Sequence, residues 1–439
     1  MAILAAELTA DETAAPRIQG RHVAAAVVGN WLEFYDFGVY AYFSLQIGDT
    51  FFPTHTAFER LLFSLITFGV GFVFRPLGAV VFGRIADRAG RRPAMLASFF
   101  LMGAALVCFV LVPGYRQIGL AAPVLAVICR LVQGFALGGE VGPNSAFLVE
   151  AAPAGQRGFF GAWQSASQSL AGISAGAVGL ASAHLLSAAD MHDWGWRVAL
   201  GIGALVLPFG LIVRRTLPET RHHEEPKLDV HPDHDAGASQ LTVLAGHWRV
   251  ILLGVGLIAG ATISTYVFNF MTTYAQATLH MGVRTAMLIA ITNGIAGFTA
   301  SLFGGWLSDR FGRKPLMVWP RVLFLLLIWP VFTLVVKIRE PALLLGLMAG
   351  LNFVANIALV PAFVALVEAL RKDIRGIAVG TIYAVAVAVF GATTQPIVAW
   401  LDQVTGNPMA ISWYLMAGAL VGLGAAILMP ETVQRPARR

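Results

Sequence analysis

Apolar runs of roughly 20 residues recur along the whole of this chain, and each is long enough to cross a bilayer as a helix. The composition agrees, since 57% of the 439 residues are hydrophobic, only 12% are charged and the mean hydropathy is +0.72. A soluble domain of this length usually carries about twice that charged fraction. The sequence therefore predicts an all-α, polytopic membrane protein.

The basic residues are placed to orient such a protein and not to bind nucleic acid. The formal net charge is +6 and the isoelectric point is near 9.6, but Arg and Lys lie mainly in short segments between apolar runs. This is the positive-inside pattern, which with an even number of spans predicts that both termini are cytoplasmic. The first apolar run begins near Val23 and no small-residue cleavage site follows it, so no cleavable signal peptide is expected.

The runs predict twelve spans, six before and six after a polar stretch of about 30 residues. That stretch, "PETRHHEEPKLDVHPDHDAGASQ", is rich in Pro, His and acidic residues and is typical of a solvated linker. We therefore expect an amino-terminal six-helix half (1–216), a cytoplasmic linker (217–247) and a carboxy-terminal six-helix half (248–439). The spans are expected at roughly 22–46, 58–84, 94–113, 118–150, 158–186, 196–216, 248–277, 284–307, 315–336, 341–369, 376–401 and 409–429.

Three short segments recur in the two halves at an offset of about 220 residues, which is half the chain. The longest pair is "GRIADRAGRRP" at 83–93 and "GWLSDRFGRKP" at 305–315. Because each half has an even number of spans, the two copies have the same orientation, and the sequence predicts a parallel repeat. The other pairs are Arg157-Gly158 with Arg375-Gly376, and "LPET" at 217–220 with "MPET" at 429–432.

The paired Gly-x-x-x-Asp-Arg-x-Gly-Arg-[Arg/Lys] segments resemble the signature loop between spans two and three, and eight and nine, of the major facilitator superfamily, so each is expected to form a compact charged loop between two spans. "GNWLEFYDFGVY", "FRPLGAVVFGRIADRAGRR", "RLVQGFALGGE" and "DWGWR" resemble its metabolite–proton symporter family, which includes permeases for citrate, α-ketoglutarate, shikimate and proline/betaine. "PGYRQIGLAAPVL", "WQSASQ" and "ATTQPIVAWL" look most like the citrate and tricarballylate branch. The resemblance covers the whole chain and implies the twelve-helix fold and a bacterial inner membrane.

Charged residues of the repeated segments are candidates for a gate. Such charges pair with carboxylates at neighbouring helix ends and interact with helix dipoles. The resemblance implies a cytoplasmic latch that holds the outward-open state; the alternative is that these charges only set the topology. The candidates are Asp87, Arg88, Arg91, Glu140 and Glu150 in the amino half, and Asp309, Arg310, Arg313 and Glu368 in the carboxy half.

Five ionisable residues lie well inside predicted spans, where a charge costs several kcal/mol unless it is paired or hydrated. Glu33 and Asp36 lie halfway along the first span, Arg75 lies in the second and Arg130 in the fourth. Each is therefore a functional candidate. Arg321 lies in the ninth span, which is peripheral in the family that the chain resembles. The simplest expectation is that it snorkels towards the cytoplasmic face, and a role in binding is the alternative.

The first span carries its acids on one face. At 100° per residue, Asn30, Glu33 and Asp36 lie within an arc of about 120°, so this stripe faces something other than lipid. The resemblance implies that the first and fourth spans of each half line a central cavity. Glu33 or Asp36 would then face Arg130 at mid-membrane, either as a working site or as a static salt bridge that organises the amino half.

A working pair would link a proton to an anion. A carboxylate beside a guanidinium stays ionised, whereas one deprived of that partner and desolvated binds a proton more readily. An anionic substrate that competes for Arg130 would therefore release an acid to take up a proton. Arginine suits this role because its planar guanidinium binds a carboxylate through two parallel hydrogen bonds, and because it does not deprotonate. Glu33 and Asp36 are the predicted proton-coupling residues.

Neutral polar side chains inside other spans would complete a binding cavity. Thr262, Tyr266, Asn269 and Thr273 of the seventh span fall within about 60° of one another around the helix. Hydrogen bonding between helices is the alternative role for such residues. The predicted substrate-binding residues are Arg130, Arg75, Asn30, Tyr35, Gln133, Gln164, Gln168, Tyr266, Asn269, Asn352 and Asn356.

These features favour a proton-coupled symporter that takes up a small organic acid, citrate or a related di- or tricarboxylate, by alternating access. No nucleotide-binding loop is visible, so an ion gradient is the expected energy source, with no cofactor and with a monomer as the working unit. Alternatives with the same fold are uptake of α-ketoglutarate, shikimate or proline/betaine, and drug efflux by proton antiport. The short carboxyl terminus argues against the osmosensing proline/betaine branch, and the intramembrane arginines argue against efflux.

Enzymatic and sensory functions are disfavoured by the residues that are present. His184, His192 and His247 fall singly or in loops, and no nucleophile–base pair is evident. Cys108 and Cys129 lie inside predicted spans and indicate neither a disulfide nor a metal site. A nutrient sensor would be expected to carry a large soluble extension. The histidines of the linker could hold a metal, but a hydrophilic connector is the simpler interpretation; they are His222, His223, His231 and His234.

Overall fold

The computed structural model describes residues 20–89, 91–138, 148–149, 152–153, 155–204, 208, 248–370 and 375–432. Within these ranges the regular elements are all helices and no strand occurs, which confirms the predicted all-α class. Seven helical segments of the described chain are long and apolar enough to cross a membrane, and two further apolar helices are shorter. The predicted linker, 217–247, with its four histidines, lies outside the described residues.

The helices of the amino half follow the predicted order of spans. The first two spans are each built from two helices, and a short π-helical turn precedes the helical residues 196–204 at the sixth. The elements are α2 (Gly20–Tyr42), α3 (Ser44–Phe51), α4 (Ala57–Val73), α5 (Arg75–Ala89), α6 (Arg91–Leu111), α7 (Tyr115–Ile118), α8 (Ala121–Leu137), α10 (Arg157–Leu185), α11 (Ala188–Asp190) and η2 (Met191–Gly195).

The carboxy half supplies the remaining six spans, with a π-helical turn in the eleventh. Its elements are α14 (Trp248–Ala277), α15 (Val283–Phe311), α16 (Arg313–Ile338), α17 (Pro341–Ala369), α18 (Arg375–Ala386), η3 (Val387–Gly391), α19 (Ala392–Thr405) and α20 (Ala410–Leu428).

The second span is not one straight helix, because the chain breaks at Phe74, between α4 and α5. Pro76 explains the break, since it has no N–H to donate and its ring clashes with the carbonyl group of Phe72, four residues earlier. The break sets the direction of Arg75, which begins α5.

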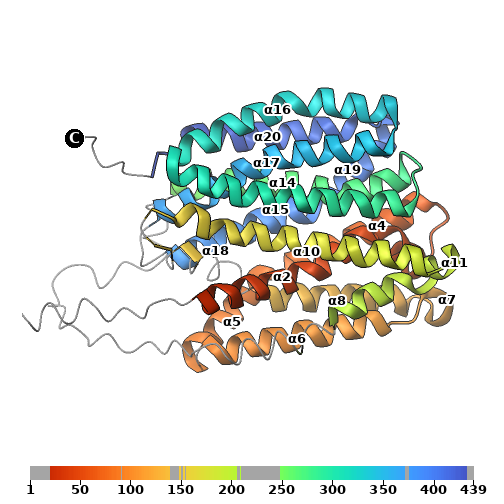
Figure 1. Ribbon diagram of the computed structural model, residues 1–439. Coiled ribbons are helices and arrows are strands. Elements are labelled where there is room, and N and C mark those ends of the chain that lie inside the picture. Colours follow the sequence, from red (N-terminus) through yellow and green to blue (C-terminus); the bar gives the residue numbers. More distant parts are fainter. Residues whose placement is uncertain are drawn as a thin grey trace, which may run out of the picture.

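The helices run side by side in one bundle, with α10 and α15 between the remaining helices of the two halves (Figure 1). The first residues of α10 and α18 lie at one end of the bundle, together with the turn from α5 to α6. We call this the loop end, because the repeated segments 83–93 and 305–315 lie there. The end that carries α7 and α11 is called the opposite end.

Small residues let the helices approach closely, as is common where lipid provides no hydrophobic drive between helices. A Cβ atom on Gly134 of α8 would overlap the backbone of Gly71 in α4. Between the halves, a Cβ atom on Gly158 of α10 would overlap the carbonyl oxygen of Gly305 in α15. The bundle is therefore held by direct backbone contact at these points.

The repeated charged segment of the carboxy half is helical, and the expectation of a charged loop was wrong. Asp309 and Arg310 occupy the last turn of α15, and Arg313 begins α16. Gly312 alone links the two helices with φ of 95°, a conformation that glycine adopts without a steric penalty. A one-residue link keeps the charges of both helix ends next to each other.

Candidate binding cavity and gate

A cavity of about 100 Å³ lies between the two halves. Helices α2 and α10 form its amino wall, where Phe34, Phe37 and Gly172 are exposed to it. Helices α14, α15 and α17 form the carboxy wall. The polar side chains that line it are Tyr42, Ser165, Gln168, Ser169, Thr265, Tyr266, Asn269, Asn293, Asn352 and Asn356.

Three asparagines of α15 and α17 form a polar cluster on the carboxy wall. Asn352 donates a hydrogen bond to the carbonyl oxygen of Asn293 (2.7 Å), and Asn356 donates to the side-chain oxygen of Asn352 (2.8 Å). The side-chain amide of Asn293 is buried, and neither its oxygen nor its nitrogen has a hydrogen-bond partner. Leaving such a group unsatisfied costs about 1–3 kcal/mol, so a polar ligand in the cavity would be stabilised there.

Five of the predicted binding residues line this cavity: Gln168, Tyr266, Asn269, Asn352 and Asn356. Sequence reasoning missed Asn293. The available signal was an asparagine in the middle of the apolar eighth span, "AITNGIAG", of the same kind that singled out the asparagines of the tenth.

The other six predicted binding residues lie elsewhere in the amino half, and three of them join helices there. Asn30 and Gln164 bond to each other, since the Gln164 amide donates to the Asn30 side chain (2.9 Å) and Asn30 donates to Ser167 (2.7 Å). The Tyr35 hydroxyl donates to the carbonyl oxygen of Ala199 (3.0 Å). These contacts join α2 to its neighbours within the half.

Asp36 and Arg130 form a buried ion pair. Nη1 of Arg130 lies 3.0 Å from a carboxylate oxygen of Asp36 and 2.5 Å from the side-chain oxygen of Gln133. Only 1% of the Asp36 side chain and 2% of the Arg130 side chain are exposed. Of the two acids predicted to face Arg130, the structure brings Asp36 to it, while Glu33 is also buried.

Aromatic rings separate this pair from the cavity. The guanidinium carbon of Arg130 lies 4.1 Å from the centre of the Tyr40 ring and 5.5 Å from those of Phe37 and Phe68. Phe37 lines the cavity and Arg130 does not. Such rings stabilise a cation through their negative faces. Arg130 is thus held one side chain behind the cavity wall.

Arg75 lies beside the cavity, close to the carboxy half. Its guanidinium lies over the rings of Phe72 (4.5 Å) and Phe37 (4.9 Å). In the carboxy half, the side chain of Tyr383 in α18 lies near both Arg75 and Gln168. Sequence reasoning did not identify Tyr383, which has no polar neighbour at helical spacing in "GTIYAVAVAVF".

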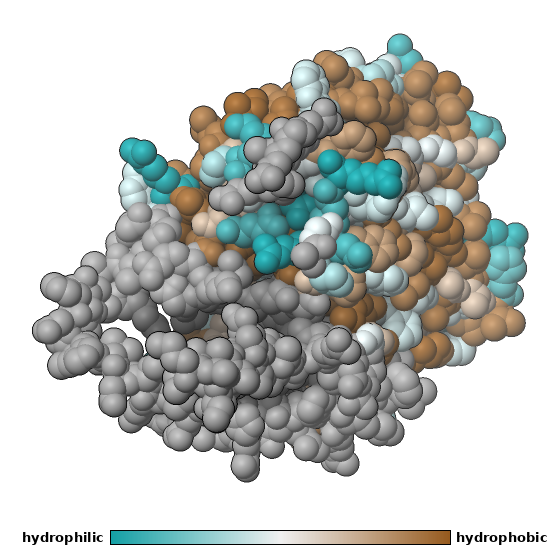
Figure 2. Space-filling model, turned by 60° about the vertical axis from the view of Figure 1, so that its left-hand side comes forward, coloured by the Kyte–Doolittle hydropathy of each residue, from teal (hydrophilic) through white to brown (hydrophobic). Residues whose placement is uncertain are grey.

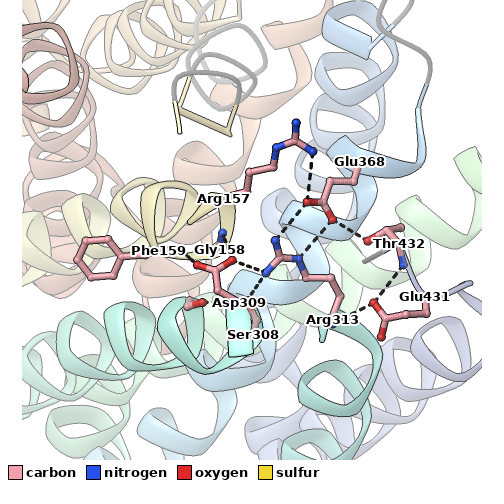
Figure 3. Close-up of polar contacts among 10 residues, drawn as sticks. Arg157, Gly158, Phe159, Ser308, Asp309, Arg313, Glu368, Glu431 and Thr432 are labelled. Atoms are coloured by element: carbon pink, nitrogen blue, oxygen red, sulfur yellow. Dashed lines mark hydrogen bonds and ion pairs between the residues drawn. The ribbon is translucent and has the colours of Figure 1, made fainter. Parts of the chain in front are cut away.

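At the loop end, Asp309 of α15 caps the first turn of α10 across the interface between the halves (Figure 3). Its carboxylate accepts hydrogen bonds from the backbone N–H groups of Gly158 (2.8 Å) and Phe159 (2.9 Å). The start of a helix has unpaired N–H groups and a partial positive charge, so it favours a carboxylate.

Arg313 connects this cap to the end of α17. Its guanidinium donates to Asp309 (2.8 Å) and pairs with Glu368 (3.2 Å) (Figure 3). Glu368 also lies 3.9 Å from Arg157 of the amino half. Three of the predicted gate residues, Asp309, Arg313 and Glu368, therefore form one network.

The repeated "PET" segment takes part in the same network. Glu431 accepts hydrogen bonds from the backbone N–H groups of Arg313 (3.0 Å) and Lys314 (2.9 Å), and so caps α16. The hydroxyl group of Thr432 donates to Glu368 (2.7 Å). Sequence reasoning used "MPET" only as a marker of the repeat, although its recurrence was a signal of a structural role.

Of the other predicted gate residues, the structure describes the side chain of Arg310 alone, and it is not in this network. Arg310 is exposed and lies over the ring of Trp306, 4.4 Å from its centre. Hydrophilic residues gather at the loop end between hydrophobic flanks (Figure 2). Glu140, Glu150 and the side chains of Asp87, Arg88 and Arg91 lie outside the described part of the structure.

The halves also touch toward the opposite end. The hydroxyl groups of Ser44 in α3 and Thr273 in α14 are 3.0 Å apart. A Cβ atom on Gly69 of α4 would overlap the carbonyl oxygen of Ala392 in α19. The cavity thus lies between contacts that join the halves on both of its sides.

The Major Facilitator Superfamily model matches residues 27–393 of this chain. The chain belongs to this superfamily. Two similar superfamily members are citrate-proton symporters. That of Salmonella typhi is 33% identical over 402 residues, which cover 91% of this chain and 92% of the relative. That of Klebsiella pneumoniae is 33% identical over 399 residues, or 90% of this chain and 88% of the relative.

A solved structure in the same superfamily agrees with the fold. The xylose transporter XylE of E. coli, in a partially occluded inward open conformation, superposes with a TM-score of 0.74 at 20% identity. The superposition covers 94% of this chain and 98% of XylE. The predicted major facilitator fold is therefore confirmed.

Proposed function

We propose that this superfamily member is a proton-coupled symporter that takes up a small organic anion, citrate or a related di- or tricarboxylate. The observation that carries the proposal is the polar cavity between the halves, which lies next to a buried acid–arginine pair. The names of its relatives, citrate-proton symporters at 33% identity over most of both chains, support the substrate class. Transport, and not catalysis, is the proposed activity.

The proposed mechanism is alternating access, in which the halves 1–216 and 248–439 rock about the cavity while 217–247 connects them. The Asp309 network would hold the loop end closed, and the Ser44–Thr273 and Gly69–Ala392 contacts would hold the opposite end closed. Each set must break in turn for substrate to enter and leave.

Gln168, Tyr266, Asn269, Asn293, Asn352 and Asn356 are the proposed substrate-binding residues of the cavity, with Arg75 and Tyr383 beside it. Amide and hydroxyl groups suit the carboxylate and hydroxyl oxygens of such an anion. Arg130 is the proposed partner of the coupling acids, close enough that a charge in the cavity acts on it through the Phe37 ring.

Asp36, with Glu33 on the same helix, is the proposed carrier of the coupling proton. While Asp36 is paired with Arg130, its ionised form is stabilised. An anion that attracts the guanidinium would weaken this pairing, and Asp36 would then take up a proton. Substrate and proton binding are linked in this way without direct contact.

In the membrane, we expect both termini in the cytoplasm of a bacterial cell, with the protein in the inner membrane, surrounded by lipid and acting as a monomer. The loop end would then be the cytoplasmic end, which agrees with the basic residues of 83–93 and 305–315.

The deciding experiment is uptake of labelled citrate into proteoliposomes, with and without an inward proton gradient. We expect accumulation only with the gradient, and inhibition by unlabelled tricarballylate. Competition by α-ketoglutarate, shikimate or proline in place of tricarballylate would move the substrate elsewhere, and an E. coli α-ketoglutarate permease is itself 30% identical. Uptake that is independent of a proton gradient would refute the coupling.

The coupling residues are tested by amide variants in the same vesicles. Glu33→Gln or Asp36→Asn should keep exchange of external for internal citrate while losing gradient-driven accumulation, because an amide does not carry the proton. Normal accumulation by both single variants would rule out these acids as the coupling groups.

A further inference from the structure

A second, smaller cavity of about 30 Å³ lies inside the carboxy half, next to the central one. Helices α14, α16, α17 and α20 enclose it. The two cavities share five lining residues: Thr265, Phe268, Asn352, Asn356 and Leu359. The second cavity is therefore a side chamber of the central one.

Arg321 of α16 lies on the wall of this side chamber. The side chain is only 7% exposed, so the expectation that it snorkels to the surface was wrong. Instead the guanidinium turns back along its own helix and donates to the carbonyl oxygen of Met317 (2.9 Å). It stays inside because α17 and α20 pack against α16.

Small residues opposite Arg321 keep the chamber open. Gly260 of α14 packs directly against the backbone of Gly422 in α20, and a Cβ atom on Gly422 would lie 3.5 Å from Nε of Arg321. Ala419, one turn earlier in α20, also lines the chamber. Side chains of ordinary size at these positions would fill the space in front of the guanidinium.

In the described part of the chain, no carboxylate pairs with the Arg321 guanidinium. A buried cation without a partner is costly, and an anion placed beside it offsets that cost. A guanidinium has five N–H donors, and the Met317 carbonyl accounts for one of them. The remaining donors form the planar fork that matches a carboxylate.

We propose that Arg321 is a subsite for one carboxylate group of the transported anion, reached from the central cavity past Asn352 and Asn356. This inference rests on the proposed uptake of an organic anion. The remaining groups of the anion would stay in the central cavity, so the ligand spans both spaces. Arg321 would then favour anions with an additional carboxylate over shorter ones.

The test combines removal of the arginine with removal of a ligand carboxylate. Binding to the purified full-length chain is measured for tricarballylate, and for glutarate and methylsuccinate, which each lack one of its carboxylates. Arg321→Gln should weaken tricarballylate binding about 10- to 100-fold, the effect of losing a charge-assisted pair of hydrogen bonds. At least one of the dicarboxylates should bind Arg321→Gln within about twofold of the wild type, because the group that contacts Arg321 is gone.

Two further variants separate charge from folding. Arg321→Lys keeps the cation but not the planar fork, so it should weaken tricarballylate binding clearly less than Arg321→Gln does. Arg339→Gln makes the same substitution at the exposed end of the same helix and should change nothing.

Several results would overturn the inference. One is that Arg321→Gln binds tricarballylate as tightly as the wild type does. Another is that Arg321→Gln loses the same factor of affinity for all three ligands. A third is that Arg321→Lys and Arg321→Gln lose the same factor of affinity for tricarballylate. Failure of the wild-type protein to bind any of the three carboxylates would instead overturn the proposed function, and the subsite with it.

Discussion

At the scale of single residues, the Asp36–Arg130 pair shows how charges are kept within the bundle. Removing both ions from water costs several kcal/mol each, and their mutual attraction offsets this only when the remaining donors and acceptors are also satisfied. Gln133 accepts from the same guanidinium nitrogen, and the Tyr40 ring covers the guanidinium face. One carboxylate oxygen of Asp36 still has no partner, which is where a proton would bind.

The first prediction concerns the cost of breaking this pair. Arg130→Met should destabilise the protein by about 3–5 kcal/mol, because it leaves a buried carboxylate without its cation. The double variant Asp36→Asn/Arg130→Met should be more stable than the sum of the two single effects. Thermal unfolding of purified protein without ligand measures both quantities.

An exposed pair provides the control. Arg60 and Asp49 are also in contact, at 2.5 Å, but their side chains are 27% and 29% exposed. Arg60→Met should cost about 1 kcal/mol or less, since water and salt screen such a pair. Equal destabilisation by Arg60→Met and Arg130→Met would show that burial does not govern the cost.

At the scale of helices, the halves meet through helix ends and glycines. Asp309 of α15 caps the start of α10. Such a cap usually comes from a residue next to the helix in sequence, but here it joins the two halves. Gly158 and Gly69 allow backbone contact between halves at the loop end and toward the opposite end. In alternating access, each set of contacts would have to break when the corresponding side opens.

The second prediction follows from the space around these glycines. Gly69→Ala should prevent close approach of α4 to α19 and slow uptake strongly, at least tenfold, with the opposite end more accessible to thiol reagents. Gly158→Ala should slow uptake equally but expose the loop end. The measurement is uptake, combined with labelling of single cysteines introduced at each end.

Gly346 of α17 is the matched control, because a Cβ atom there would contact nothing within 4 Å. Gly346→Ala should leave uptake unchanged and raise stability slightly, since alanine favours a helix by up to about 1 kcal/mol. If Gly69→Ala and Gly158→Ala behaved like Gly346→Ala, the close contacts would have no part in transport.

At the scale of the whole molecule, the two halves enclose the cavity and touch at both of its sides. A protein that works by alternating access must separate them on one side at a time. The contact between Ser44 and Thr273 joins α3 of the amino half to α14 of the carboxy half, so it reports on one of these sides.

The third prediction uses this contact as a lock. In a chain whose native Cys108 and Cys129 are replaced by serine, Ser44→Cys/Thr273→Cys should form a disulfide under oxidation, because the two hydroxyl groups are 3.0 Å apart. Oxidised protein should lose uptake, and a reductant should restore it. Each single cysteine variant is the control, and full uptake by the cross-linked protein would contradict rocking of the halves.

Much of the architecture was predictable from the sequence. Hydropathy indicated twelve spans because lipid forces nearly every span to be an apolar helix. The recurrence of "DRFGRKP" indicated the repeat, and charges inside spans marked Asp36 and Arg130 as residues of interest. The charged segment at 305–315 was expected to be a loop, because sequence patterns alone do not show that Gly312 turns the chain in a single residue.

Among the binding candidates, the sequence alone could not separate residues of the cavity wall from those behind it. Gln164 and Gln168 lie one turn apart on α10, yet Gln164 bonds to Asn30 within the amino half and Gln168 faces the cavity. The difference depends on a small rotation of the helix against its neighbours, which packing of distant segments determines.

The sequence by itself determined that this chain spans a membrane in two related halves, because the lengths of the apolar runs and the recurrence of motifs are visible along the chain without knowledge of its packing. Only the tertiary structure decided which charges meet. Asp309 reaches the start of α10, Arg130 lies behind Phe37, and Arg321 faces an internal chamber. These placements depend on close packing between helices that are far apart in the sequence, and no local periodicity encodes them.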